Sequence, residues 1–289
     1  MTSAYDFPAV SARDLSVYYR SQNPATRSIA VNGVNFEVPQ GEVLAIVGET
    51  GSGKSTLAQA IALQADIPED GAPEFRGGAL DVLGVPVRGI SPRRRSRLSL
   101  HIGYIPQEAG DTLIPNYTIA ENVSYPIFSR DPRFDKAEAI ELVATLIDGM
   151  RLPLSCLDEY PYELSKGQRQ RVAIARALIL EPTLVVADDP TAGIDATVRG
   201  AVLDQIARLQ QERLFSAIVV TADLREVRRI STRMAVMHRG TIVGIGDVDE
   251  VLGDPTHPYV KGLARSLKLR GRGESELIEQ LALEAFGVD

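Results

Sequence analysis

The stretch that decides the fold is a glycine-rich run between an apolar segment and a helix-forming segment. It reads Gly48-Glu49-Thr50-Gly51-Ser52-Gly53-Lys54-Ser55-Thr56 and fits the pattern G-x-x-x-x-G-K-[ST]. Residues 43–47, Val-Leu-Ala-Ile-Val, predict a buried parallel strand because they are apolar and rich in β-branched side chains. Residues 57–63 favour a helix, so the glycines fall where a strand passes into a helix.

The residue types in this loop predict a site for a nucleotide polyphosphate. Glycines let backbone N–H groups approach phosphate closely, and the start of the helix adds partial positive charge. Lys54 is expected to reach the β- and γ-phosphates, and the Ser55 hydroxyl to hold Mg²⁺. The alternative is a glycine-rich turn that binds nothing, but the ordered strand, loop, Lys-Ser pair and helix argue against it.

The composition is that of an ordinary globular protein. The chain has 289 residues, 44% hydrophobic and 24% charged, which suits one large or two unequal domains. The net charge of -7 argues against nucleic acid as the main partner. A single cysteine, Cys156, excludes an internal disulfide and favours a reducing cytoplasm. We expect no membrane span and no secretory signal, because the apolar runs are short and residues 1–8 lack a basic region followed by an apolar one.

The pattern along the chain predicts an α/β fold. Alternating side chains predict antiparallel strands at 15–19, 29–31 and 34–38, and apolar runs predict buried strands at 102–106, 184–187 and 217–221. Residues 234–243 predict an edge hairpin. The expected fold is therefore a mostly parallel sheet that carries the glycine-rich loop, with an antiparallel β subdomain and an inserted helical subdomain.

Four segments are expected from this pattern. They are the N-terminal part of the core at 1–107, the helical subdomain at 108–180, the C-terminal part of the core at 181–250 and an extension at 251–289. Within the helical subdomain, Ile140, Val143, Ala144 and Ile147 predict one apolar helix stripe. Residues 274–286 predict an amphipathic helix, which fits docking on this chain's own core or on a twin chain equally well.

Polar side chains follow two of the predicted strands. Gln107 follows 102–106, at the end of the strand where open α/β sheets place ligand-contacting groups. Asp188 and Asp189 end the next strand, and we expect Asp188 to hold Mg²⁺ through water and Asp189 to orient the attacking water. Tyr19 either stacks on a purine base or packs in the sheet, and the residues alone favour packing.

A basic cluster, Arg93-Arg94-Arg95-Ser96-Arg97, leaves two interpretations open. It is either a solvated helix face or a contact for phosphate or lipid headgroups. Such runs are more often solvated, so the sequence favours the first interpretation.

Several motifs occur in the order seen in ABC-transporter ATPase subunits. They are the glycine-rich loop, Gln107, Leu164-Ser165-Lys166-Gly167-Gln168 before a helical run, and Asp188-Asp189. The chain resembles that family over nearly its whole length. Leu113–Asn116 and Asp254-Pro255-Thr256-His257-Pro258-Tyr259 resemble the importer group for oligopeptides, dipeptides and nickel chelates, although the cysteine cluster sometimes found in that group's tail is missing.

The resemblance implies cofactors, partners and a location. ATP and Mg²⁺ would be sandwiched between two ATPase subunits, and ATP binding would close the dimer. The expected partners are two transmembrane permease subunits, a second ATPase subunit and, indirectly, an extracytoplasmic solute-binding protein. The expected location is peripheral, on the cytoplasmic face of the cell membrane.

The resemblance also implies residue roles. Tyr19 matches the aromatic residue that stacks on adenine, which reverses the preference for a packed tyrosine. Gln107 matches the residue that contacts Mg²⁺ and the attacking water and senses the membrane subunit. The signature Ser165-Lys166-Gly167-Gln168 would contact the γ-phosphate held by the second subunit, and Asp195 lies in the loop that contacts the other subunit.

Three positions depart from the family pattern. Asp189 stands where the catalytic residue is normally Glu, Ala222 where a histidine contacts the γ-phosphate, and Lys166 where the signature has glycine. The shorter carboxylate of Asp189 falls back by about 1 Å, a misplacement that costs about a hundredfold in rate. Ala222 has no donor at all. The sequence therefore predicts that the chain's own site binds Mg-ATP but hydrolyses it slowly, within a heterodimer whose second ATPase is competent; a homodimer is the rival arrangement.

Two other functions compete with transport. A soluble ABC ATPase of translation or DNA repair usually joins two ATPase domains or carries long coiled coils, and this chain has one set of motifs and no long heptad run. A non-catalytic, ATP-binding regulatory subunit is kept open by Asp189 and Ala222. The transported solute cannot be read from the ATPase sequence.

Overall fold

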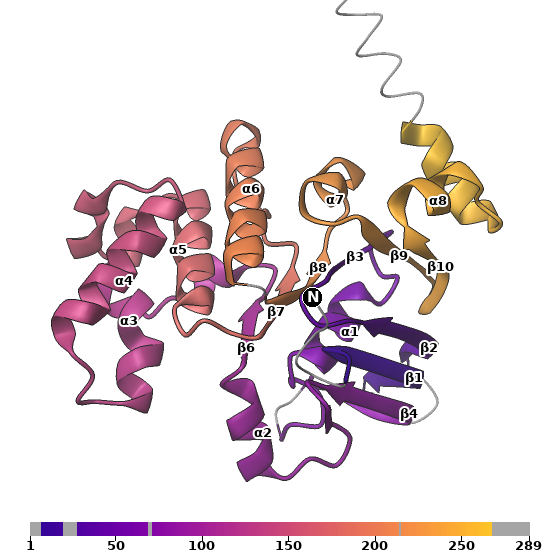
Figure 1. The fold of residues 1–289 in the computed structure, drawn as a ribbon, viewed down its shortest axis with the longest axis horizontal. Coiled ribbons are helices and arrows are strands. Elements are labelled where there is room, and N and C mark those ends of the chain that lie inside the picture. The colour runs from indigo at the N-terminus through magenta and orange to yellow at the C-terminus, as the bar shows by residue number, and fades with distance from the viewer. Residues whose placement is uncertain (1–6, 20–27, 69–70, 214, 268–289) are drawn as a thin grey trace, which may run out of the picture.

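The structure, a computed structural model, describes residues 7–19, 28–68, 71–213 and 215–267 (Figure 1). It confirms the predicted fold class, with a six-stranded, mostly parallel sheet and a separate four-stranded antiparallel sheet. Helices α3, α4 and α5 gather on the side of the molecule farthest from the antiparallel sheet (Figure 1).

The larger sheet has the strand order β10-β9-β3-β8-β7-β6. Its strands are β3 (Val43–Gly48), β6 (Ile102–Ile105), β7 (Leu184–Asp188), β8 (Ser216–Val220), β9 (Arg233–His238) and β10 (Thr241–Asp247). All neighbouring pairs are parallel except β9 and β10. The central strands are continuous apolar runs because helices cover both faces of a parallel sheet.

The smaller sheet has the order β2-β1-β4-β5. Its strands are β1 (Val10–Tyr19), β2 (Ser28–Val38), β4 (Pro73–Val82) and β5 (Val85–Pro86). The two short strands expected at 29–31 and 34–38 are one strand, β2, because Gly33 adopts a φ of 61° and lets the ladder continue through irregular register. Helix α1 (Lys54–Ile61) packs into the hydrophobic cluster that both sheets share, so the glycine-rich loop before it is fixed on two sides.

The helices follow the expected distribution. They are α2 (Pro92–Ser99), α3 (Ile119–Arg130), α4 (Lys136–Gly149), α5 (Lys166–Leu178), α6 (Ala196–Arg213), α7 (Leu224–Ile230) and α8 (Val248–Gly253), with short 3₁₀ turns η2 (Ala109–Thr112), η3 (Leu154–Asp158) and η4 (Pro161–Glu163). The stripe predicted on α4 is wrong at one position: Val143 and Ile147 are buried, but Ile140 is 61% exposed. The segment boundaries at 107, 180 and 250 remain predictions.

Two expectations about the sheet edge are corrected. The predicted hairpin is β9-β10, but β9 is interior because it also pairs with β3, and only β10 lies at that edge of the described sheet. Strand β6, expected to be buried, forms the opposite edge and leaves Ile102 and Tyr104 half-buried. A hairpin pattern in sequence does not reveal which distant strand pairs with it.

The helix predicted at 274–286 lies outside the described residues. In the part of the chain that is described, no helix is both long and apolar enough to cross a bilayer.

Candidate nucleotide-binding site

The loop of residues 48–56, called the P-loop below, lies between β3 and α1 as predicted. Two of its glycines are required by the backbone around it. A Cβ on Gly48 would lie 2.2 Å from the Met237 carbonyl oxygen, and one on Gly53 would lie 2.1 Å from the Ala30 carbonyl oxygen. The loop is therefore closed in by strands β9 and β2, and its shape depends on both.

Lys54 is held inside the curve of this loop. Its Nζ donates hydrogen bonds to the carbonyl oxygens of Gly48 at 2.8 Å and Glu49 at 2.7 Å. Burial lowers the pKa of Lys54, while the carboxylates of Asp188, Asp189 and Glu49 act in the opposite direction. The ammonium group is thus fixed by the carbonyl oxygens at the start of the loop.

Ser55 and Asp188 form the oxygen pair expected for a magnesium site. The Ser55 hydroxyl donates to Asp188 Oδ1 at 3.1 Å, and Asp188 is only 4% exposed. Burial raises the pKa of Asp188, opposed by the Ser55 hydrogen bond and by Lys54. Hydroxyl and carboxylate oxygens suit Mg²⁺, which binds proteins through one or two such groups together with substrate phosphates.

A cavity of about 360 Å³ opens over the P-loop and has the size of a ligand pocket. Its predicted lining residues come from several segments that are distant in sequence: Tyr19, Thr50, Gly51, Gly53, Lys54, Ser55, Thr56, Gln107, Asp188, Asp189 and Ala222. Ile29, Ala30, Val220 and Thr221 also line it and were not predicted. Ile29 and Ala30 are apolar, so the sequence does not indicate that they line a nucleotide cavity, and only the fold places them there.

Tyr19 enters this cavity from the end of β1. Its hydroxyl lies 3.1 Å from Thr56 Oγ1 and donates to Gln59 Oε1 at 3.1 Å, so helix α1 fixes the ring. The ring is half-buried and lines the cavity together with the P-loop residues.

The two unusual positions, Asp189 and Ala222, face the same cavity. Asp189 has a φ of 49°, and its backbone N–H donates to the Val220 carbonyl at 2.9 Å. Burial raises the pKa of Asp189, with further contributions from the charges of Glu226 and Asp188. The backbone of this residue is therefore fixed, which limits how far its short side chain can advance.

Sequence reasoning missed Glu226, which joins the two loops that carry these positions. It is 5% exposed and accepts hydrogen bonds from Thr191 Oγ1 at 2.8 Å and Thr221 Oγ1 at 2.6 Å. Arg199 lies 3.6 Å away as its ion partner. The sequence could have indicated that Glu226 is buried, because it lies on the same face of α7 as the buried Val227 and Ile230.

The signature residues do not line this cavity. Ser165 is the N-cap of α5: its Oγ accepts from the Gln168 N–H at 3.3 Å, and Gln168 Oε1 accepts from the Ser165 N–H at 2.8 Å. Lys166 is exposed and forms an ion pair with Glu108 at 2.8 Å, and Gly167 packs near the Gly193 carbonyl. The start of α5 is therefore an ordered helix N-terminus, but it lies outside the nucleotide cavity of the same chain.

Asp195 also lies apart from the cavity. It is exposed, and its Oδ1 accepts hydrogen bonds from the N–H and the hydroxyl of Thr197 at 2.8 and 2.7 Å. These bonds lower the pKa of Asp195 and fix the start of α6. Because Gly193 packs beside the Lys166 side chain, the Asp195 loop and the signature form one surface.

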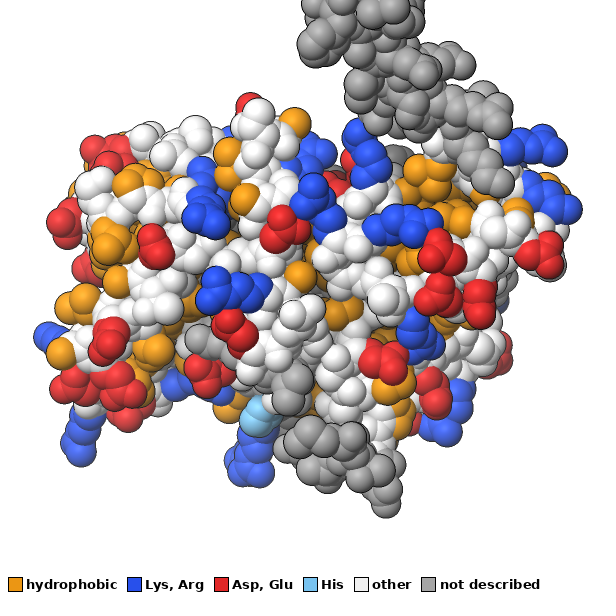
Figure 2. Space-filling model, turned by 45° about the horizontal axis from the view of Figure 1, so that its top comes forward, with side chains coloured by type: hydrophobic (Ala, Val, Ile, Leu, Met, Phe, Trp, Pro, Cys, Tyr) orange, Lys and Arg blue, Asp and Glu red, His pale blue; other side chains and the backbone are white. Residues whose placement is uncertain are grey.

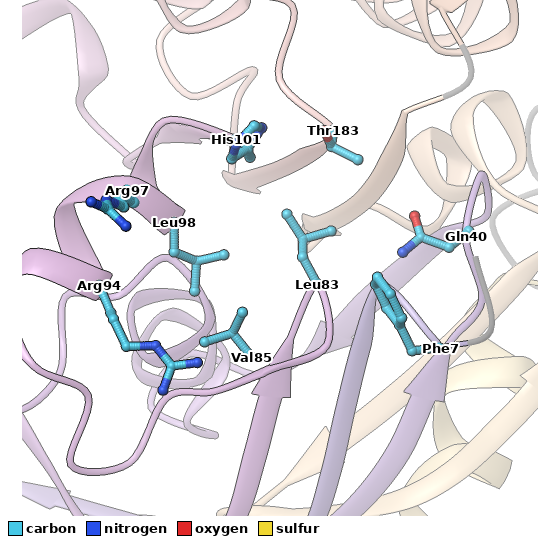
Figure 3. Close-up of a pocket in the computed structure, with 9 residues that line it drawn as sticks. All are labelled: Phe7, Gln40, Leu83, Val85, Arg94, Arg97, Leu98, His101 and Thr183. Atoms are coloured by element: carbon cyan, nitrogen blue, oxygen red, sulfur yellow. The ribbon is translucent and has the colours of Figure 1, made fainter. Parts of the chain in front are cut away.

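A second cavity, of about 370 Å³, lies at the opposite ends of the parallel strands (Figure 3). Residues that precede β3, β6 and β7, namely Gln40, His101 and Thr183, line it together with apolar residues and two arginines of α2. Arg94 and Arg97 are exposed, in agreement with a solvated helix face, whereas Arg95 donates to the carbonyls of Leu63 and Ala65. The glycine-rich loop and the helix N-terminus of the first cavity have no counterpart among these lining residues.

Comparison with known proteins agrees with this geometry. The model of the family described as ABC transporter matches residues 31–192. The chain is 34% identical over 273 residues to the oligopeptide transport ATP-binding protein OppD of Bacillus subtilis, covering 93% of this chain and 74% of that protein. It is 35% identical over 240 residues to OppF of Escherichia coli, covering 83% and 70%.

A solved structure shares the fold. It is a dimeric, post-hydrolysis state of the ATP-binding cassette MJ0796 bound to ADP and Pi, with a TM-score of 0.74 and 25% identity. The match covers 83% of this chain and 98% of that chain. The chain therefore belongs to the ABC transporter family, in which it is an ATP-binding subunit that couples ATP hydrolysis to transport.

Proposed function

We propose that this chain is an ATPase subunit of a peptide importer whose own catalytic site binds Mg-ATP but turns it over slowly. The transport of peptides rests on the relatives, since OppD and OppF are oligopeptide transport proteins and another relative is a putative peptide import protein of Brucella ovis. The slow turnover rests on one observation: the cavity keeps the binding groups, but Asp189 and Ala222 occupy its catalytic positions.

The binding half of the site supports ATP and Mg²⁺. Backbone N–H groups of the P-loop and Lys54 would hold the phosphates, Ser55, Gln107 and Asp188 would hold the metal, and Tyr19 would stack on adenine. Mg²⁺, when bound, supplies charge neutralisation between the β- and γ-phosphates. All of these groups are of the residue types that binding of phosphate, Mg²⁺ and adenine requires.

The catalytic half is altered in two ways. The Asp189 backbone is fixed by its bond to the Val220 carbonyl and by the Ala192 N–H, which donates to the Asp189 carbonyl at 3.0 Å. Because the backbone is fixed, the loop does not shift to compensate for the shorter side chain of Asp189. The carboxylate is then misplaced, which costs about a hundredfold in rate. Loss of the donor at Ala222 removes a transition-state contact, which costs about another hundredfold to a thousandfold where such donors have been deleted.

The signature supports a role in trans. Ser165 and Gln168 form a complete capping box, so the N-terminus of α5 is ordered, and it lies outside this chain's own cavity. A second subunit facing it would place its γ-phosphate there. We propose that this partner is a different ATPase with an intact catalytic glutamate and histidine, that a homodimer is the rival arrangement, and that ATP binding closes the dimer.

The permease contact is proposed on the helical part. A groove between α3 and α4 is lined by Tyr117, Tyr125 and Ile140, which are exposed by 38%, 46% and 61%. Hydrophobic side chains reach the surface over these helices, at the left of Figure 2. An exposed apolar groove of this kind suits a short helix of a transmembrane subunit, which would hold the chain at the cytoplasmic face of the membrane. The solute-binding protein would then contact the permease and not this chain.

The test measures ATP binding and ATP turnover of the purified chain side by side. The unaltered chain should bind Mg-ATP and turn it over slowly, and Asp189→Glu combined with Ala222→His should raise turnover at least about tenfold with little change in affinity. Lys54→Ala is the control that should abolish binding. Brisk turnover by the unaltered chain would overturn the proposal.

A regulatory subunit is the second candidate, favoured only by the altered residues Asp189 and Ala222. Co-purification with two membrane proteins supports transport, and their absence from a complex isolated in detergent supports regulation. A soluble ATPase of translation or repair would instead co-purify with ribosomes or DNA.

A further inference from the structure

The back of the P-loop rests on the turn between β9 and β10. The Gly240 N–H donates to the Ser52 carbonyl at 3.0 Å, and the Asn32 N–H donates to the Gly240 carbonyl at 2.8 Å. Arg239 and Gly240 both have positive φ, as the tight hairpin requires. The turn therefore supports the P-loop through its backbone at Ser52.

His238 reaches the P-loop from this turn. Its Nδ1 lies 2.9 Å from Glu49 Oε1, and the histidine side chain is 21% exposed. The nitrogen is buried and, among the described residues, has no hydrogen bond of good geometry, although it lies in contact with the Glu49 carboxylate. Glu49 is the second residue of the P-loop, and its carbonyl is one of the two that bind Lys54.

Tyr259 covers His238 from the C-terminal side. The two rings stack with centroids 4.4 Å apart and planes 21° apart, and the ring of His257 lies 5.7 Å from that of His238. Burial, and after it the charge of Glu49, raise the pKa of the Tyr259 hydroxyl, while a hydrogen bond with the Glu49 backbone acts in the opposite direction. Tyr259 thus reaches the P-loop at Glu49 although it lies outside the matched residues 31–192.

The helix at 258–267 is firmly anchored. Val260 and Ala264 are buried in one cluster with Val47, the last residue before the P-loop, and with Val236 of β9. Tyr259 packs at the border of this cluster. Its ring is therefore held in place by the same core that holds the end of β3.

We propose that His238 and Tyr259 are positioning residues that hold the Glu49 end of the P-loop in the shape that receives the polyphosphate. They contact Glu49 and not the nucleotide. Because P-loop backbone N–H groups bind phosphate, a shift of the Glu49–Thr50 peptide changes the number of donors that reach it. The C-terminal segment thereby sets the affinity of the chain for ATP.

The test is the affinity of the full chain for a fluorescent ATP analogue with Mg²⁺. Tyr259→Leu keeps an apolar side chain at the cluster border but removes the stacked ring, and should weaken binding about threefold to tenfold, the range expected for one aromatic pair. Tyr259→Phe keeps the ring but removes the hydroxyl that bonds to the Glu49 backbone, and should therefore weaken binding less than Tyr259→Leu does. The matched control is Tyr162→Leu, since Tyr162 also stacks, on Tyr160 with centroids 5.4 Å apart, but lies far along the chain from the P-loop.

A double-variant cycle separates positioning from general damage. Because Tyr259 and His238 stack on each other and both contact Glu49, the double variant Tyr259→Leu with His238→Gln should lose less affinity than the product of the two single losses. The proposal would be overturned if the two single losses of affinity multiplied in the double variant. It would also be overturned if Tyr259→Leu bound the ATP analogue normally, or if Tyr162→Leu lost as much affinity as Tyr259→Leu. If Tyr259→Leu does not fold, as judged by thermal unfolding without nucleotide, His238→Gln must show the loss by itself, and normal binding by it contradicts the proposal.

Discussion

At the scale of single residues, Glu226 connects the two positions that distinguish this ATPase. Its two carboxylate oxygens accept from Thr191, two residues after Asp189, and from Thr221, the residue before Ala222. A buried carboxylate is stable only when hydrogen-bonded and paired, and Arg199 completes the arrangement. Glu226 therefore ties together the two loops that carry Asp189 and Ala222.

Replacing Glu226 should destabilise the chain strongly. Glu226→Ala leaves two buried threonine hydroxyls without their acceptor and should lower the free energy of unfolding by about 2–3 kcal/mol. Urea denaturation of the isolated chain measures this. Glu212→Ala is the matched control, because Glu212 is an exposed partner of Arg208, and it should cause no measurable change. Equal stability of the two variants would contradict the role given to Glu226.

At the scale of elements, α3 is fixed by its first turn. Thr118 Oγ1 accepts from the Glu121 N–H at 3.2 Å, and Glu121 Oε2 accepts from the Thr118 N–H at 2.7 Å. The buried Asn122 adds bonds to the carbonyls of Ile114 and Tyr117, both at 3.0 Å. The segment before α3 is therefore held to the first turn of the helix by several hydrogen bonds.

Removal of the α3 cap should cost about 1 kcal/mol of stability. Thr118→Ala loses the acceptor for the Glu121 N–H, whereas Thr118→Ser keeps it and should stay close to the unaltered chain. Thermal unfolding of the two variants gives the comparison. If Thr118→Ser proved as destabilising as Thr118→Ala, the methyl group of the threonine, and not the cap, would be what matters.

The sequence predicted the elements well where local pattern decides them. Residues 43–63 give strand, loop and helix as expected, because glycines, apolar residues and helix formers follow one another directly. Long-range contacts were not predictable: the interior place of β9, the bonds of Glu226 and the stack of Tyr259 on His238 join residues distant in sequence. Ile140 was misplaced because an apolar residue on a helix looks the same whether it faces a core or a partner.

At the scale of the whole molecule, the P-loop cavity and the signature lie apart on the chain. The cavity contains none of the residues Ser165 to Gln168, in agreement with the proposal that they act on a second subunit. The binding half and the signature half are each well ordered. In the proposed heterodimer, this chain would differ from its partner at Asp189 and Ala222, which both line the cavity.

The most direct test uses the ATPase activity of the isolated transporter complex, with changes made in this chain only. Asp189→Asn should leave the activity within about twofold, because the partner's site performs the hydrolysis, whereas Ser165→Ala should lower it at least about tenfold by removing a donor to the partner's γ-phosphate. Equal losses for the two variants would contradict the account, because they would show that this chain's own P-loop site hydrolyses ATP as the partner's does.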